Sequence, residues 1–370
     1  MSEFTFDLAT PADDSAIRRL LANNPVPGRV TVTYEREPNY FLGCATMGHF
    51  CQVLVARHRP SGQVAAVATR TTRPLFVNGA IEEVGYIGQL RVDERFRARW
   101  LVSGGFRYFY QLHADGRVAG YITTIIEGNT EAQGILVEHA RRHFPVYREV
   151  DRLCTLAIIL RKQKIPLPLK EGANITPASP ADLPAIIGFL HQYGATKQFF
   201  PVFGEADFAG ATTLDFRVED FMVARQNGQI VGVMGLWDQL RYKQTIVRAY
   251  HGSLRWLRPF YNGWLRLSGA KPLPPPGQPI HFAYASFICM AQNNPDAFGI
   301  LLRYVYNLAV ARGYAYLMVG LSTRDLLLDV ARSYAHIPYY SRLYTVCWPD
   351  DQRFHKKLDQ RIPYVEIATL

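Results

Sequence analysis

The sequence contains few cysteines and no long apolar run, and both absences exclude whole classes of protein. Its five cysteines form no CxxC pair and show no metal-ligand spacing, so we expect reduced thiols and no metal site. No stretch approaches the roughly 18 apolar residues of a membrane span. The first residues are acidic and lack the apolar core of a secretory signal. We therefore expect a cytoplasmic protein without a membrane association.

Two further absences narrow the possible functions. No Gly-x-Ser-x-Gly elbow occurs and no histidine has an evident catalytic partner, so a Ser/His/Asp hydrolase is unsupported. The formal net charge of +10 suits an anionic partner such as a nucleotide cofactor. The arginines are scattered and no basic helical arm is visible, so nucleic acid is not the favoured partner.

Two segments of the first half return in the second half in the same order. Thr10-Pro11-Ala12-Asp13 returns as Ser179-Pro180-Ala181-Asp182, and Val55-Ala56-Arg57 returns as Val223-Ala224-Arg225. The offset of about 170 residues is the size of a domain and far exceeds one solenoid unit. The sequence therefore predicts a duplicated domain.

The repeats divide the chain into two domains and a linker. We expect residues 1–161 to form the first domain, residues 162–172 an exposed linker rich in Pro and Lys, and residues 173–370 the second domain. Between later matching motifs the offset grows, which indicates an insertion at about residues 250–279.

Each repeat has the same expected order of elements. A Ser or Thr N-cap, a Pro at the first helical position and an Asp at the third predict the opening helix. Hairpins are expected at residues 51–70 and 220–237, because two β-runs flank a Gly turn in each. The elements expected after the hairpins are strand 84–92, basic loop 93–100, helix 103–112, strand 119–126, helix 130–142 and strand 153–160 in the first half, and strand 282–290, helix 297–311, strand 314–321 and strand 343–348 in the second.

This order resembles the GNAT superfamily of N-acetyltransferases, and two copies resemble its tandem members. The resemblance implies an α/β (α+β) fold of two tandem GNAT-like domains, each a mixed, mostly antiparallel sheet flanked by helices. It also implies an acetyl-CoA-dependent N-acyltransferase that transfers an acyl group directly to a small-molecule or peptide amine.

The segment from Val92 to Val102 is similar to the family's strand-to-helix loop, in which Arg/Gln-x-x-Gly-x-Gly/Ala binds the pyrophosphate of acetyl-CoA. Backbone N–H groups at a helix N-terminus attract such an anion, and small residues let it approach. Arg97 matches the first position, whereas Trp100 and Val102 stand where small residues belong. Trp100 either projects outward or fills the anion site, and Gly104-Gly105 come slightly later.

Asn129 matches an Asn that the family often places beside the cofactor, and it is equally suited to cap a helix. The resemblance thus implies the following cofactor-binding residues: Leu90, Arg91, Val92, Arg97, Ala98, Arg99, Trp100, Leu101, Val102, Ser103 and Asn129.

Attack of an amine on a thioester needs a base for the ammonium proton. Strict strand alternation places Glu83, Gln89 and Arg91 on one face of strand 84–92 and Tyr86 and Gly88 on the other. The catalytic candidates are Glu83, Tyr86 and Gln89. The Tyr that protonates the departing thiolate in many family members is replaced by Leu136.

The second half departs further from the family pattern. Residues 291–297 contain neither an Arg nor a Gly pair, so we expect this domain to keep the fold and lack the cofactor site. For the insertion two interpretations stay open. Arg255, Trp256, Arg258, Tyr261 and Trp264 border the acceptor site, or Trp256, Phe260 and Trp264 form the buried stripe of a helix packed on its own domain.

Two other functions compete with the transferase. A catalytically inactive tandem module could bind a CoA ester or another ligand, because the Tyr and the loop glycines are missing. An aminoacyl-tRNA-dependent transferase also fits paired domains of this fold, although the scattered arginines count against it. The sequence leaves open the acceptor, the acyl chain length and the oligomeric state.

Overall fold

Each half of the chain begins its first helix at a capping box. The backbone N–H of Thr10 donates to Oδ2 of Asp13 at 2.8 Å, and that of Ser179 donates to Oδ2 of Asp182 at 2.7 Å. A short 3-10 turn then leads into helix α1 (Asp14–Ala22) or α5 (Leu183–Gly194). The predicted helix starts are therefore confirmed in both halves.

The computed structural model describes residues 3–97, 99–138 and 144–370, without the side chains of residues 99 and 100. Its strands are β1 Phe4–Leu8, β2 Val30–Glu35, β3 Phe50–His58, β4 Val64–Val77, β5 Ala80–Val92, β6 Tyr121–Ile126, β7 Val146–Ile159, β8 Ala173–Pro177, β9 Phe221–Gln226, β10 Gln229–Trp237, β11 Gln244–Tyr250, β12 Phe282–Met290, β13 Tyr316–Ser322 and β14 His336–Cys347. The remaining helices are α2 Tyr40–Ala45, α3 Arg99–His113, α4 Thr130–Gln133, α6 Glu205–Ala209, α7 Ser253–Leu267, α8 Pro295–Ala311, α9 Leu327–Arg332 and α10 Arg353–Lys356.

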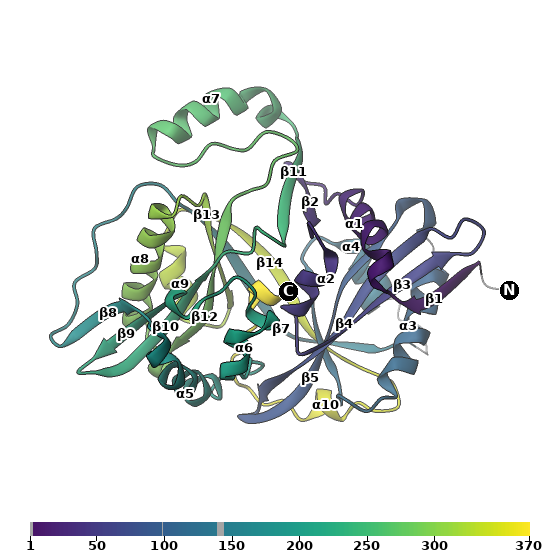
Figure 1. The fold of residues 1–370 in the computed structure, drawn as a ribbon, viewed down its shortest axis with the longest axis horizontal. Helices are drawn as coiled ribbons and strands as arrows, with labels where there is room; N and C mark the ends of the chain where they lie inside the picture. Colours follow the sequence, from purple (N-terminus) through teal and green to yellow (C-terminus); the bar gives the residue numbers. More distant parts are fainter. Residues whose placement is uncertain (1–2, 98, 139–143) are drawn as a thin grey trace.

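The twelve-stranded sheet has the same strand order when it is followed inward from either edge (Figure 1). One edge runs β1-β3-β4-β5-β6 and the other runs β8-β9-β10-β12-β13, and β14 and β7 lie between them. In each half one pair is parallel, β5 with β6 and β12 with β13, and the other pairs are antiparallel. The predicted GNAT-like fold class is therefore confirmed.

The closing strands are exchanged between the halves. β14 of the second half pairs with β6, β7 of the first half pairs with β13, and the two pair with each other. This exchange joins the two expected sheets into one. The domain limits at residues 161 and 173 stay a prediction.

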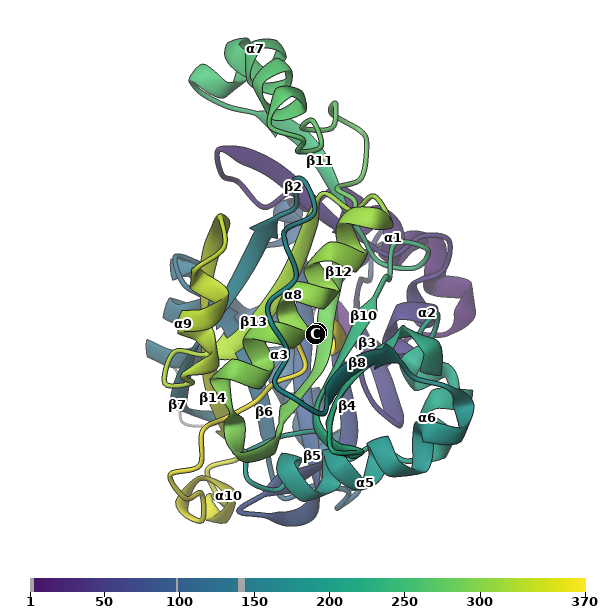
Figure 2. The ribbon, with the colours of Figure 1, turned by 90° about the vertical axis from the view of Figure 1, so that its left-hand side faces the viewer.

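Helices cover both faces of the sheet (Figures 1 and 2). In the first half α3 covers one face with Phe106 and Phe109, and α1 and α2 cover the other with Ile17 and Tyr40. In the second half α8 and α9 share a larger apolar core with α5. No helix of the described residues has the length and apolarity needed to cross a membrane.

Both predicted hairpins form, as β3–β4 and β9–β10. The helix expected at 130–142 is shorter in its described part, because α4 continues as a wider turn over Gly134–Glu138, and residues 139–143 lie outside the described residues. The linker forms no helix or strand at residues 162–172 and is tied to α8, where Asn307 exchanges two hydrogen bonds of 2.8 Å with the main chain of Lys164. The sequence did not predict β2 and β11, which pair with each other outside the main sheet.

A buried histidine fastens α10 to the closing strands and should make stability depend on pH. In neutral His355, Nδ1 accepts from the hydroxyl of Thr345 at 2.7 Å and Nε2 donates to the carbonyl of Val146 at 3.1 Å. Burial is the main cause that lowers the pKa of His355 to about 4. Because the unfolded chain binds this proton at a pH of about 6.5, the free energy of unfolding should fall by about 2.5 kcal/mol as the pH drops from about 6.5 to about 4.

Urea unfolding at several pH values measures this loss, and a His355→Gln variant is the matched control. Gln keeps a donor and an acceptor but does not titrate, so its stability should change less over the same range. An equal pH dependence in both proteins would show that another group is responsible.

Candidate functional site

A large cavity lies between the two halves of the molecule. Its volume is about 1340 Å³. The first half contributes β5, β6 and α3, the second half contributes β11, α7, β12 and β13, and β2 and the closing strands complete the wall. The volume exceeds that of a typical drug-sized ligand pocket, about 300–1,000 Å³.

One arm of the cavity is a slot between β5 and β6. These strands pair in parallel only at Gly85–Tyr86 with Tyr121–Ile122 and then separate. Residues 87–92 of β5 and 123–126 of β6 line the cavity beyond that point. At the base of the slot the hydroxyl of Tyr86 lies 3.1 Å from Oγ1 of Thr124.

A β-bulge in β5 changes the side of the sheet that its last residues face. Gln89 has a φ of 55°, and the pairing with β4 shifts by one residue between Gly88 and Arg91. Tyr86, Gly88 and Arg91 therefore face the same side of the sheet, opposite alternate residues of β4. The predicted alternation, which placed Arg91 with Glu83, is wrong beyond the bulge because it assumed a strict period of two.

The cavity gathers most of the predicted cofactor-binding residues. Those that line it are Leu90, Arg91, Val92, Leu101, Val102 and Asn129. Arg97 and Ser103 do not line it. Ala98 lies outside the described residues, as do the side chains of Arg99 and Trp100, so the two alternatives for Trp100 stay open.

Helix α3 begins at Arg99, directly after the basic loop. The side chain of Arg97 is about half exposed, with Nη1 at 3.5 Å from Oε2 of Glu131 in α4. Gly104, which the sequence placed near the phosphate loop, packs against β1: an added Cβ would approach the ring of Phe6 to 2.4 Å. This glycine therefore lets the helix approach the sheet closely.

Of the two roles that the sequence left open for Asn129, the helix cap is confirmed and the contact with the cofactor stays a prediction. Oδ1 of Asn129 accepts from the backbone N–H of Ala132 at 3.1 Å, so this residue caps α4. It also lines the cavity at the mouth of the slot, together with Ala132.

The three catalytic candidates lie in different surroundings. Tyr86 and Gln89 line the cavity, whereas Glu83 is exposed, lies outside it and accepts a hydrogen bond of 2.5 Å from the hydroxyl of Thr72. Burial raises the pKa of Tyr86, so its phenol stays protonated at neutral pH. Their catalytic roles stay a prediction.

Three cations that the sequence analysis did not single out as a group meet on one side of the cavity. Arg36, Arg91 and Lys243 all line it, and among the described residues no Asp or Glu side chain forms an ion pair with any of them. Burial, followed by repulsion from Arg36, holds the pKa of Lys243 well below its ordinary value, and burial also lowers that of Arg91. The Lys243 ammonium donates to the main-chain oxygens of Ala368 and Leu370, each at 2.9 Å. This side of the cavity therefore gathers three basic side chains, and burial disfavours the charged forms of Lys243 and Arg91.

In the second half, the position that corresponds to the slot is filled by the chain itself. β12 has the same bulge as β5, with Phe287 at a φ of 55°. The N–H of Phe287 donates to Oε2 of the buried Glu366 at 2.7 Å, and that of Ile288 donates to the hydroxyl of Tyr364 at 3.1 Å. Ile367 packs so closely on β13 that a Cβ at Gly320 would lie 2.4 Å from it.

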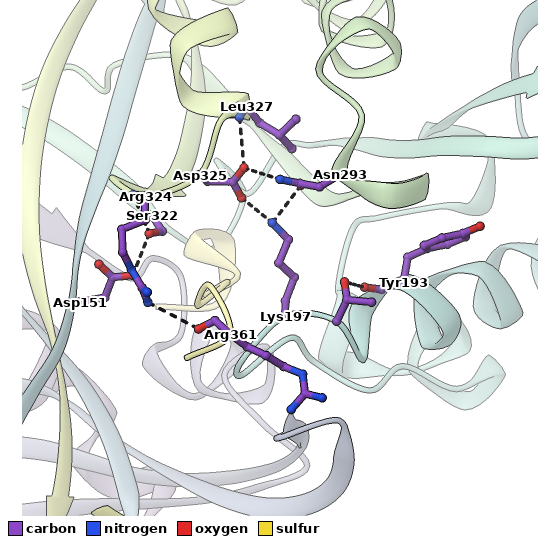
Figure 3. A network of polar contacts seen from close by, with 10 residues as sticks. Asp151, Tyr193, Lys197, Asn293, Ser322, Arg324, Asp325, Leu327 and Arg361 are labelled. Carbon is purple, nitrogen blue, oxygen red and sulfur yellow. Dashed lines mark hydrogen bonds and ion pairs between the residues drawn. The ribbon is translucent and has the colours of Figure 1, made fainter. Parts of the chain in front are cut away.

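The far end of this second position is closed by a polar network (Figure 3). Nζ of Lys197 donates to Asp325 at 2.6 Å and to Asn293 at 2.9 Å, and the amide of Asn293 donates to Asp325 at 2.9 Å. At the start of α8, Oδ1 of Asn294 accepts from the N–H groups of Asp296 and Ala297 at 2.9 and 3.0 Å. The N–H groups at the start of α8 and the ammonium of Lys197, which would otherwise bind an anion here, already donate hydrogen bonds to protein oxygens.

The insertion forms β11's last residue, helix α7 and a proline-rich return segment. The interpretation of Trp256, Phe260 and Trp264 as a buried stripe is wrong, because all three side chains are exposed. The cavity is lined instead by another face of α7, which includes Leu254, Leu257, Tyr261 and Leu265.

Comparison with solved structures shows which known proteins share this architecture. A GCN5-related N-acetyltransferase from Sphaerobacter thermophilus matches 100% of this chain and 99% of its own, with a TM-score of 0.55 and 15% identity. N-myristoyltransferase from Saccharomyces cerevisiae, solved with bound myristoyl-CoA, matches 99% of this chain and 86% of its own, with a TM-score of 0.64 and 11% identity. A GCN5-related glucosamine N-acetyltransferase region of a fungal GH3 β-N-acetylglucosaminidase matches 94% of this chain and 38% of its own, with a TM-score of 0.62 and 13% identity. No protein-family model and no curated protein matches the sequence. The chain has the GNAT fold.

Proposed function

We propose that the protein is an acyl-CoA-dependent N-acyltransferase with its cofactor in the first half and its amine acceptor in the cavity between the halves. The observation that carries the proposal is the difference between two corresponding positions of the fold. The slot between β5 and β6 opens into the cavity, whereas the position between β12 and β13 is filled by Tyr364, Glu366 and Ile367. The yeast structural neighbour binds an acyl-CoA, which supports the same ligand class here.

The slot suits the extended pantetheine arm, because it is bordered by two strands that no longer pair and whose backbone groups can bond to the amides of the arm. The start of α3, with Arg97 and Arg99 before and at its first residue, would hold the pyrophosphate through N–H groups and positive charge. The sequence favours acetyl-CoA as the donor. The cavity also has room for a longer acyl chain beside an acceptor.

In the proposed reaction the amine nitrogen attacks the thioester carbonyl carbon. A C–N bond forms, the C–S bond breaks and CoA leaves as a thiolate, while the proton of the ammonium passes to a base. Tyr86 is our candidate for protonating the thiolate, because its phenol is protonated and reaches the slot. It would replace the Tyr that is missing at Leu136.

The cationic side of the cavity indicates an acceptor that carries an anionic group beside its amine, such as an amino acid. Arg91, which the bulge turns away from the Glu83 face, would attract that anion together with Lys243.

We expect faster transfer to β-alanine than to propylamine. In an Arg91→Met variant the kcat/KM for β-alanine should fall roughly tenfold, which corresponds to about 1.4 kcal/mol, while that for propylamine changes little. Equal losses for both acceptors would contradict an anion site at Arg91.

Calorimetric titration with acetyl-CoA and with acyl-CoAs of increasing chain length tests the proposed function directly. We expect one binding site per chain. Replacing Arg97 and Arg99 together by Ala should weaken binding by about 2 kcal/mol, roughly 30-fold, since Arg97 is half exposed and the two contributions are not additive. Unchanged affinity would place the cofactor elsewhere.

The matched control removes two exposed arginines from surfaces remote from the slot, Arg241 in the second half and Arg353 in α10. This variant has the same net charge as the Arg97/Arg99 variant and should bind like the parent. Tight binding without CoA release across a panel of amines would instead favour the inactive binding module.

A further inference from the structure

Helix α7 carries an exposed apolar stripe that no part of the described chain covers. Trp256, Phe260 and Leu267 are 74%, 78% and 84% exposed, and Trp264, which is 50% exposed, lies beside them. In both views of the molecule α7 stands clear of the sheet and its covering helices (Figures 1 and 2). Large aromatic side chains are rarely left in water in such a group unless the surface binds something.

The stripe points outward because the other faces of α7 are already engaged. The side-chain amide of Asn262 exchanges two hydrogen bonds with the main chain of Leu273, at 2.8 and 3.2 Å, and Arg258 donates to the carbonyl of Pro274 at 3.2 Å. Leu265 is buried and lines the cavity. Turning the stripe inward would break these contacts, so the exposed face is a stable feature of the fold.

The charged residues of the insertion are all basic. Residues 250–279 contain Arg255, Arg258, Arg266 and Lys271 and no Asp or Glu. Arg161, directly before the linker, adds to this charge, because its guanidinium lies over the ring of Trp264 at 5.4 Å. A surface that combines Trp, Phe and Leu with Arg and Lys matches the headgroup region of an anionic bilayer, where apolar side chains enter the acyl boundary and cations contact phosphates.

We propose that α7 is a docking helix that binds an anionic lipid surface. The helix lies in the plane of the interface with Trp256 and Phe260 inserted, and Arg255 and Arg266 remain close to the lipid phosphates. A second copy of the chain is a poorer occupant, since it would bring two segments of equal positive charge together. This surface contact departs from the expectation of no membrane association, which rested on the absence of a spanning segment.

The docked helix also forms one wall of the cavity, through Tyr261 and Leu265. Docking would therefore place the cavity against the bilayer, where a substrate with an apolar chain is concentrated. The docking itself does not depend on the proposed acyl transfer.

The test is flotation of the full-length protein with vesicles of phosphatidylcholine alone and of phosphatidylcholine mixed with phosphatidylglycerol. We expect binding to the mixed vesicles that weakens as salt rises, and little binding to the neutral ones. Replacing Trp256 and Phe260 together by Glu should abolish it. Replacing Arg255 and Arg266 by Gln should weaken it roughly 30-fold, taking about fivefold for each cation near the surface.

The matched control replaces two other exposed apolar residues, Ile81 and Leu326, by Glu, which changes the charge equally at sites far from α7. It should float with the vesicles like the parent. The Trp256/Phe260 variant should keep the parent's melting temperature, because neither side chain is buried.

Three outcomes would overturn the proposal. The parent does not float with the anionic vesicles, or it binds neutral vesicles equally well, or the Trp256/Phe260 variant floats unchanged. If light scattering shows that the parent is a dimer and the Trp256/Phe260 variant a monomer, with no vesicle binding by either, a second copy covers the stripe instead.

Discussion

Replacing Ala132 by Trp should abolish acyl-CoA binding, with a loss of at least about 1,000-fold or about 4 kcal/mol. Ala132 lies in the first turn of α4 and lines the cavity beside Asn129 at the mouth of the slot. An indole there would project into the cavity at the slot between β5 and β6, where it would compete with the pantetheine arm for space. Ala132 is partly buried and packs against the apolar core below α3, so the fold of the variant must be checked.

The second half supplies the matched control. Leu326 is exposed at the start of α9, which corresponds to the start of α4, and the neighbouring slot position is already filled. A Leu326→Trp variant should therefore bind acyl-CoA like the parent. Calorimetry measures both affinities, and circular dichroism checks that both variants are folded. Full affinity in the Ala132 variant, or a comparable loss in the Leu326 variant, would contradict the assignment of the cofactor to the first half.

Local signals in the sequence predicted the elements whose structure depends on neighbours in the chain. The capping boxes at Thr10 and Ser179 need only three residues to form, and the hairpin turns need only a Gly between two β-runs. The repeat of these signals was enough to predict the GNAT-like fold class.

The features that the sequence missed depend on distant partners. β14 pairs with β6 across more than two hundred residues, and β2 pairs with β11 over a similar separation, so no local pattern reveals either contact. The bulge at Gln89 also lacks a local signal, because a positive φ usually marks a Gly. It moved Arg91 to the side of the sheet that Tyr86 and Gly88 face.

The cationic side of the cavity was missed for the same reason. Arg36, Arg91 and Lys243 come from three separate segments that meet only in the folded chain. For α7 the apolar spacing was visible, but periodicity does not tell whether a stripe is covered by the same chain or left exposed.

Replacing Glu366 by Ala should lower the free energy of unfolding by about 3–5 kcal/mol. The carboxylate accepts three hydrogen bonds within the core, from the N–H of Phe287 at 2.7 Å, the hydroxyl of Tyr364 at 2.7 Å and the N–H of Ala368 at 3.3 Å. An unsatisfied buried donor costs about 1–3 kcal/mol, and the three losses add incompletely because they share one partner. Urea unfolding followed by fluorescence reports this site, since the indole of Trp237 is stacked on the ring of Phe287.

A Glu366→Gln variant separates the hydrogen bonds from the charge. Burial raises the pKa of Glu366, so the folded protein holds this proton more tightly than the unfolded chain. Relative to the Gln variant, the parent should therefore lose stability as the pH rises from the ordinary value of a Glu, about 4.3, through the raised value, because only the parent carries this titrating group. Gln retains one acceptor oxygen, so Glu366→Gln should lower the free energy of unfolding less than Glu366→Ala.

Glu219→Ala, which removes an exposed carboxylate, should have little effect on the free energy of unfolding. If Glu366→Ala unfolds at the same urea concentration as the parent, the segment around Glu366 does not hold the second half's slot closed, and the argument that only the first half binds the cofactor loses its main support.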